Sequence, residues 1–142
     1  MASLLPGTLV GVFVLLALVH VYWALGGQRV KIAAIPEVEG RPAFVPSRLG
    51  TLGVALALLA CALLVAIASG IVLTSLPCRV LFWFMFALAF VFLARAVGDF
   101  RLVGFFKKVT ATRFARLDIA VFSPLCLAMS IGIFVVGFIH CP

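Results

Sequence analysis

The sequence predicts an all-α integral membrane protein, a bundle of four transmembrane helices forming one domain over residues 1–142. Hydrophobic residues make up 66% of the chain and charged residues 11%, and mean hydropathy is +1.37, so no polar face could cover the apolar surface in water. Four apolar runs, about 4–26, 50–75, 79–98 and 118–140, each supply the roughly 20 residues that a helix needs to cross about 30 Å of hydrocarbon. Strand-like alternation is absent, which favours helices over a membrane barrel.

The ends of the runs predict where each helix begins and stops. We expect the first helix to end at Gly26–Gly27 and to be retained, because it lacks the charged leader and cleavage motif of a signal peptide. The second should return through a short turn at 75–78, and the third should carry a face rich in phenylalanine. The fourth should open at Asp118, which suits a helix N-terminus. Pro124 should kink or locally unwind this helix, with Ser123 satisfying the freed carbonyls.

The distribution of charge predicts how the chain threads the membrane. Ten of the eleven Lys and Arg residues lie in two stretches, 29–48 and 95–116. By the positive-inside rule, loops 27–49 and 99–117 are cytoplasmic and both termini are extracytoplasmic. The rule also accounts for the net charge of +7, so we expect no nucleic-acid partner. Three prolines argue against a long helix in the first loop. Segment 100–117 could form a short interfacial helix with Arg101, Lys107 and Lys108 facing headgroups, although Gly104 weakens that prediction.

Small residues mark where helices could approach closely. Gly7 and Gly11 form a GxxxG pair in the first helix, and Gly50 and Gly53 continue into small residues of the second. We expect these glycines to pack the bundle, in preference to forming a dedicated dimer face.

Polar residues gather near the cytoplasmic ends of the helices. His20 lies about 9 Å inside the end of the first helix, with Trp23 one turn further on. Arg95 and Asp99 are four residues apart, and Asp118 lies at similar depth. The functional interpretation is a pocket that binds an anionic group, a lipid headgroup or a proton-coupled substrate. The structural interpretation, which we favour, pairs Arg95 with Asp99, uses Asp118 as a cap, and bonds His20 to a neighbouring carbonyl.

The four cysteines divide into two classes. Cys61 and Cys126 lie at mid-membrane depth, and we expect them to act as small apolar residues in a packed interior. Cys78 and Cys141 should share the outer face, where a disulfide is possible if their Cα atoms come within about 7 Å, although free thiols remain an alternative. His140 lies beside them, but these three residues lack the spacing of a typical metal site, so they predict one only weakly. We expect no metal and no cofactor, and the sequence identifies no catalytic residue, since the familiar hydrolase, zinc-protease and phosphate-loop motifs are absent.

Several stretches together resemble a known family. They are HVYWALGG at 20–27, IPEVEGRP at 35–42, RAVGDFRLVGFFK at 95–107, TRFARLD at 112–118 and SPLC at 123–126. The chain is similar over nearly its whole length to small bacterial membrane proteins grouped as domain of unknown function 3995 (DUF3995). The resemblance implies a four-helix, multi-pass protein of the bacterial inner membrane, and no activity. It also implies that the shared pattern includes His20, Trp23, Arg95, Asp99, Arg101 and Asp118, but not Cys78, His140 or Cys141.

Three functions fit the sequence. We favour a non-enzymatic accessory or scaffold subunit that packs with lipids, with itself as a homo-oligomer, or with a larger membrane complex. The first alternative is a binder or carrier of a lipid, anion or other small ligand, using the cytoplasmic polar residues. The second is a membrane enzyme acting on a lipid or quinone-like substrate, with His20 as acid or base, oriented by Asp99 or Asp118.

Overall fold

The computed structural model describes residues 4–27, 34–38 and 41–141. In chain order they form α1 (Leu4–Ala24), β1 (Glu37–Val38), β2 (Arg41–Pro42), α2 (Arg48–Ala68), α3 (Cys78–Val97), α4 (Arg113–Leu117), a π-helical turn (Asp118–Phe122) and α5 (Ser123–His140). Because α4, the π-helical turn and α5 are continuous, four helices are long and apolar enough to cross a membrane. The predicted all-α class with four helices of membrane-spanning length is therefore confirmed.

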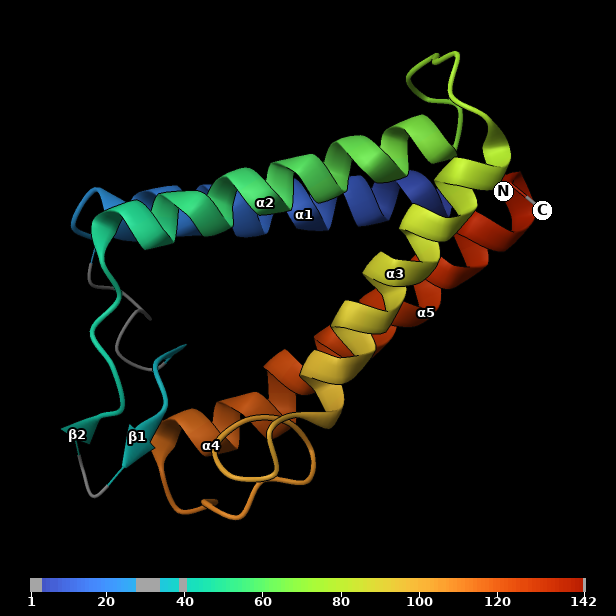
Figure 1. Cartoon of the computed structure of the whole chain (residues 1–142). Coiled ribbons are helices and arrows are strands. Elements are labelled where there is room, and N and C mark those ends of the chain that lie inside the picture. The colour runs from blue at the N-terminus through green and yellow to red at the C-terminus, as the bar shows by residue number, and fades with distance from the viewer. Residues whose placement is uncertain (1–3, 28–33, 39–40, 142) are drawn as a thin grey trace.

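The helices are arranged as two antiparallel pairs, α1 with α2 and α3 with α5. Figure 1 shows the pairs converging at the end that holds both chain termini and diverging toward the other end. The diverging end carries the short β1–β2 ladder and the loop 98–112, so the described parts of both basic loops lie at one end of the bundle (Figure 1). The membrane side of that end stays a prediction. Arg29 and Lys31 of the first basic loop lie outside the described residues.

The core lies where the helices approach most closely. Phe13, Met85 and Ile133 are fully buried, and the ring of Phe13 meets that of Phe92 edge to face at 5.5 Å. A side chain on α5 would obstruct this packing, since a Cβ added at Gly137 would lie 2.9 Å from the Cβ of Met85. Glycine therefore brings α5 onto α3.

The glycines that the sequence singled out behave differently. A Cβ added at Gly7, Gly11 or Gly53 would meet nothing within 4 Å. The expectation that these three pack the bundle was wrong, because they lie on outward faces of the helix pairs. The close approaches belong instead to Gly132 and Gly137 of α5, with a Cβ at Gly132 lying 3.1 Å from a methyl group of Leu9.

Two helix boundaries also differ from prediction. Helix α2 stops at Ala68, and residues 69–77 form a longer connection than the expected turn at 75–78. The Ser69 hydroxyl donates to Val65 O at 2.8 Å, and Gly70 adopts a φ of +76°, a conformation that ends helices.

The last span begins at Arg113 and not at Asp118, because the Thr112 side chain caps it by accepting from Ala115 N at 3.1 Å. The proposed interfacial helix over 100–117 is absent from the described chain, where only Arg113–Leu117 of that segment is helical.

Candidate functional site

His20 and Trp23 lie one turn apart on α1, and their ring centroids are 5.1 Å apart. His20 Nδ1 lies 2.7 Å from Leu16 O. A carbonyl can only accept, so Nδ1 donates this hydrogen bond, and in a neutral imidazole Nε2 would then be the acceptor. The predicted bond from His20 to a neighbouring carbonyl is thus confirmed. This carbonyl orients the ring, and not Asp99 or Asp118 as the enzyme hypothesis required.

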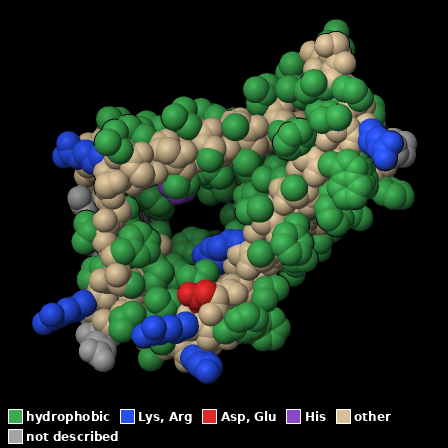
Figure 2. Space-filling model, viewed as in Figure 1, with side chains coloured by type: hydrophobic (Ala, Val, Ile, Leu, Met, Phe, Trp, Pro, Cys, Tyr) green, Lys and Arg blue, Asp and Glu red, His purple; other side chains and the backbone are tan. Residues whose placement is uncertain are grey.

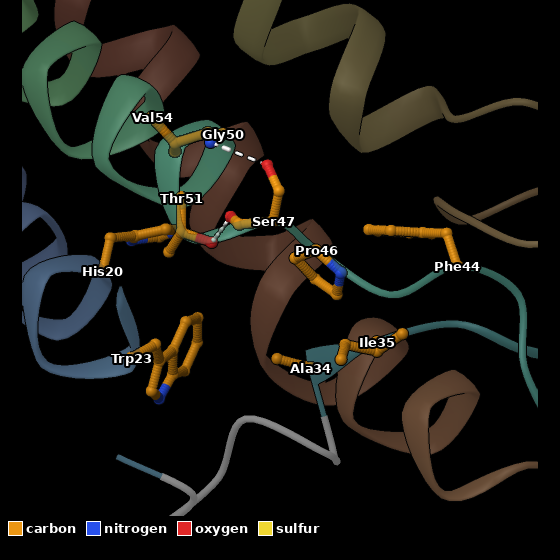
Figure 3. A pocket seen from close by; sticks show the side chains of 10 residues that line it. All are labelled: His20, Trp23, Ala34, Ile35, Phe44, Pro46, Ser47, Gly50, Thr51 and Val54. Carbon is orange, nitrogen blue, oxygen red and sulfur yellow. Dashed lines mark hydrogen bonds between the residues drawn. The ribbon is translucent and has the colours of Figure 1, made fainter. Parts of the chain in front are cut away.

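These two side chains line a cavity of about 310 Å³ at the diverging end of the α1–α2 pair. Figure 3 shows its walls, which come from α1, the first loop and the start of α2. The lining residues are His20, Trp23, Ala34, Ile35, Phe44, Pro46, Ser47, Gly50, Thr51 and Val54. At about 30 Å³ per water, this is room for roughly ten water molecules. It lies at the lower end of the range for small-molecule sites.

Two hydroxyl groups add polarity to the cavity. Ser47 caps α2, its Oγ accepting from Gly50 N at 3.0 Å, and the Thr51 hydroxyl donates to Ser47 O at 2.9 Å (Figure 3). Ser47 can still donate and Thr51 can still accept. Sequence reasoning missed both residues. The signal was present, because a serine directly before an apolar run is a typical N-cap.

A second polar centre surrounds Asp118, which is fully buried. Its Oδ1 accepts from Arg95 Nη2 at 2.9 Å, and its Oδ2 accepts from Lys107 Nζ at 2.9 Å and from Gly104 N at 2.7 Å. Lys107 Nζ also donates to Gly104 O at 2.9 Å. The carboxylate therefore joins α3, the loop 98–112 and the last span at one point.

This centre corrects three predictions. Arg95 pairs with Asp118 and not with Asp99, and Asp118 lies inside the continuous helix and not at its N-terminus. Lys107, expected to face headgroups, has a side chain with 0% exposure. Two cations face one carboxylate, and Arg95 Nη1 is buried with no hydrogen-bond partner among the described residues. An additional acceptor would therefore suit Arg95.

Two glycines fold the loop over Asp118. Gly98 and Gly104 each have a φ of +90°, and a Cβ added at Gly104 would lie 2.3 Å from Val97 O. Neither position accepts a side chain without strain. The turn directs Gly104 N toward Asp118 and brings Lys107 inward.

Asp99 closes the same turn at the surface. Its Oδ1 accepts from the backbone amides of Leu102 at 2.7 Å, Arg101 at 2.9 Å and Val103 at 3.0 Å. These amides, Leu102 first, lower the pKa of the Asp99 carboxyl below its ordinary 3.8. Arg101 contributes its backbone, and its side chain is exposed. The six predicted residues thus divide between the cavity, the Asp118 centre and this turn.

A π-helical turn follows directly at Asp118–Phe122. The amide of Ser123 donates to Asp118 O, five residues back, which widens the helix just before Pro124. The predicted local unwinding at Pro124 is confirmed. The predicted role of Ser123 was wrong, because its Oγ is buried without a hydrogen-bond partner in the described part of the chain. Wide turns of this kind are frequent at functional sites.

The remaining candidates lie at the converging end. Cys78 and Cys141 are neighbours there as free thiols, so their predicted disulfide stays a prediction. Within residues 4–27, 34–38 and 41–141, no group of three His, Cys, Asp or Glu side chains is placed to hold a metal ion.

A family model described as a protein of unknown function (DUF3995) matches residues 13–133. The chain belongs to the DUF3995 family. No curated protein and no solved structure matches it. The DUF3995 range contains both the His20 cavity and the Asp118 centre, whereas Cys141 lies beyond it.

Proposed function

We propose that this DUF3995 protein binds a small neutral amphiphile in the cavity beside His20. The observation that carries the proposal is the cavity itself, in which His20 lies beside two hydroxyl-bearing residues in an otherwise largely apolar wall. Few polar groups in a mostly apolar concave site are typical of small-molecule binding. The sequence alone favoured an accessory subunit; the cavity favours the binding alternative.

The lining suggests the chemistry of the ligand. None of the described residues that line the cavity is a Lys, Arg, Asp or Glu, so these residues offer a charged headgroup no counter-ion. A hydroxyl or amide donor would match the acceptor at His20 Nε2. Trp23 and Phe44 supply flat apolar surface for the body of the molecule. A neutral long-chain alcohol combines these features.

The space beside the cavity supports the same occupant. Figure 2 shows a hollow between the two helix pairs, with a histidine side chain at its edge and Lys or Arg side chains on the opposite side. Apolar side chains cover much of the surface around it (Figure 2). An alkyl chain extending from the cavity into this hollow would meet apolar side chains over much of its length. We also propose that the hollow opens toward the cytoplasm, since the basic loops lie at that end.

Tryptophan fluorescence tests the proposal. The chain has two tryptophans, so Trp83→Phe leaves Trp23 as the sole reporter. In nanodiscs, a bromine-labelled long-chain alcohol should quench Trp23 saturably. Adding His20→Ala should weaken the apparent affinity about 3- to 10-fold, the equivalent of one neutral hydrogen bond.

The chain supplies matched controls. His140 Nδ1 also bonds the carbonyl four residues back, at 3.1 Å from Val136 O, but lies at the converging end. His140→Ala should leave binding unchanged. In Trp23→Phe, the exposed Trp83 should be quenched without saturation, by lipid-dissolved probe. Equal affinities in the two histidine variants, or unsaturable quenching of Trp23, would contradict the proposal.

Orientation needs its own test. We propose that loops 34–47 and 98–112 face the cytoplasm and that the enclosing membrane is the bacterial inner membrane. A single cysteine placed at exposed Lys108 should resist an impermeant maleimide in intact cells and react after lysis. Labelling in intact cells would reverse the orientation without affecting the cavity. Assembly with itself or with a larger complex stays a prediction.

A further inference from the structure

Two thiols lie together at the end of the bundle opposite the cavity. Cys78 is the first residue of α3, and its Sγ lies 3.9 Å from the carbonyl oxygen of His140, the residue bonded to Cys141. Cys141 Sγ lies 3.7 Å from Ala68 O, at the last residue of α2. Three spans therefore meet within contact distance of this pair.

The two thiols have different environments. Cys78 is exposed, whereas Cys141 is 1% exposed. Burial first, and then the neighbouring Cys78 thiol, raises the pKa of Cys141 to about 11. Since Cys78 Sγ contacts the carbonyl oxygen of the residue bonded to Cys141, the two thiols are close neighbours. An accessible thiol beside a buried one is the arrangement in which the first attacks an external disulfide and the second resolves it.

We propose that Cys78 and Cys141 form a reversible disulfide that clamps the converging end of the bundle, with a small external disulfide as the oxidant. The Cys78 thiolate attacks one sulfur of the oxidant, forming a mixed disulfide and releasing one thiol. The deprotonated Cys141 then attacks Cys78 Sγ, and the second thiol leaves with the remaining proton. Two electrons pass to the oxidant, which becomes two thiols.

The clamp would act where the helix pairs join. It would tie the start of α3 to the chain just after α5, and Cys141 already contacts the end of α2. By the proposed orientation this end faces the extracytoplasmic side, where disulfides persist. The clamp does not depend on the proposed ligand, since the cavity lies at the other end of the bundle.

Oxidised glutathione, applied to the full-length protein in nanodiscs, tests the clamp. Non-reducing mass spectrometry should show the loss of two hydrogen atoms and a peptide cross-link between positions 78 and 141. Oxidation should lower the equilibrium constant for unfolding at least about 30-fold, which corresponds to the lower end of the typical contribution of a disulfide. Dithiothreitol should reverse both changes.

Single variants separate the two steps. Cys141→Ser should stop at a stable glutathione adduct on Cys78, and Cys78→Ser should leave Cys141 unmodified. Cys61→Ser and Cys126→Ser, at the chain's other two cysteines, should leave the cross-link intact. A wild-type protein that accumulates the Cys78 adduct without closing, or that cross-links through Cys61 or Cys126, would overturn the proposal even if a variant failed to fold.

Discussion

Asp118→Asn tests whether the buried charge centre holds the loop 98–112 on the bundle. Asparagine keeps one acceptor oxygen but removes the charge that faces Lys107, whose side chain has 0% exposure. Removing one partner of a buried ion pair costs about 3–5 kcal/mol, because the other charge is left uncompensated. Arg95 is 36% exposed and can reach water, so Lys107 should dominate the cost. We expect a loss of about 3 kcal/mol in the free energy of unfolding.

A double-mutant cycle identifies the source of that loss. Lys107→Met leaves Asp118 paired with Arg95 and Gly104 N, so it should cost less, about 1–2 kcal/mol. The combined variant has no stranded buried lysine and should be more stable than the sum of the single losses predicts, by about 2 kcal/mol. The assay is reversible unfolding in mixed micelles, followed by circular dichroism. Strictly additive losses, or an Asp118→Asn variant as stable as wild type, would refute the reasoning.

Four further substitutions test the loop and the helix contacts. Gly104→Ala should lower the free energy of unfolding by about 2 kcal/mol or more in the same assay, because its φ is +90° and its Cβ would meet Val97 O. Gly53→Ala should instead stabilise α2 by about 0.5–1 kcal/mol, because an added Cβ there would meet nothing within 4 Å. The pKa of Asp99 is lowered in the folded state, so its carboxylate contributes to the free energy of unfolding above pH 3.8. This contribution is lost as the pH falls through the lowered pKa. In the Asp99→Asn variant, the free energy of unfolding should therefore fall less steeply as the pH is lowered. Gly137→Ala should cost about 1–3 kcal/mol by overpacking against Met85, and unchanged stability would show that α3 and α5 can separate freely.

Composition and run length were enough to predict four helices of membrane-spanning length, because the length required of an apolar run follows directly from the thickness of the bilayer. Helix ends were less predictable. The apolar residues after Gly70 looked like helix continuation, but a serine and a positive-φ glycine terminate α2 before them. Hydropathy does not register such backbone signals.

The polar residues were correctly placed near one end but incorrectly paired. Arg95 and Asp99 would face each other only if α3 continued through position 98, and Gly98 at a φ of +90° ends the helix first. Asp99 then turns to the amides of its own loop. Lys107 and Asp118 meet through an irregular turn, so no helical periodicity relates them. Spacing predicts contacts within an element, and here the decisive contacts cross a loop.

The hollow between the helix pairs gives the ligand proposal its sharpest consequence. Closing the hollow would bring little hydrophobic gain, because lipid tails are as apolar as the helix faces. A ligand's alkyl chain would likewise only exchange one apolar neighbour for another. Preference for the cavity must therefore come from the headgroup, through His20 Nε2 and the hydroxyls of Ser47 and Thr51.

A headgroup-free probe tests this division of roles. The probe is a bromoalkane of the same chain length as the bromine-labelled alcohol. In the Trp83→Phe protein it should quench Trp23 without saturation, because it would reach Trp23 only from solution in the lipid. The alcohol should bind at least about 3- to 10-fold more tightly, because each neutral hydrogen bond contributes about 0.5–1.5 kcal/mol. If the alkane saturates Trp23 at the same concentration as the alcohol, the cavity selects by shape, and the polar residues beside it do not recognise a headgroup.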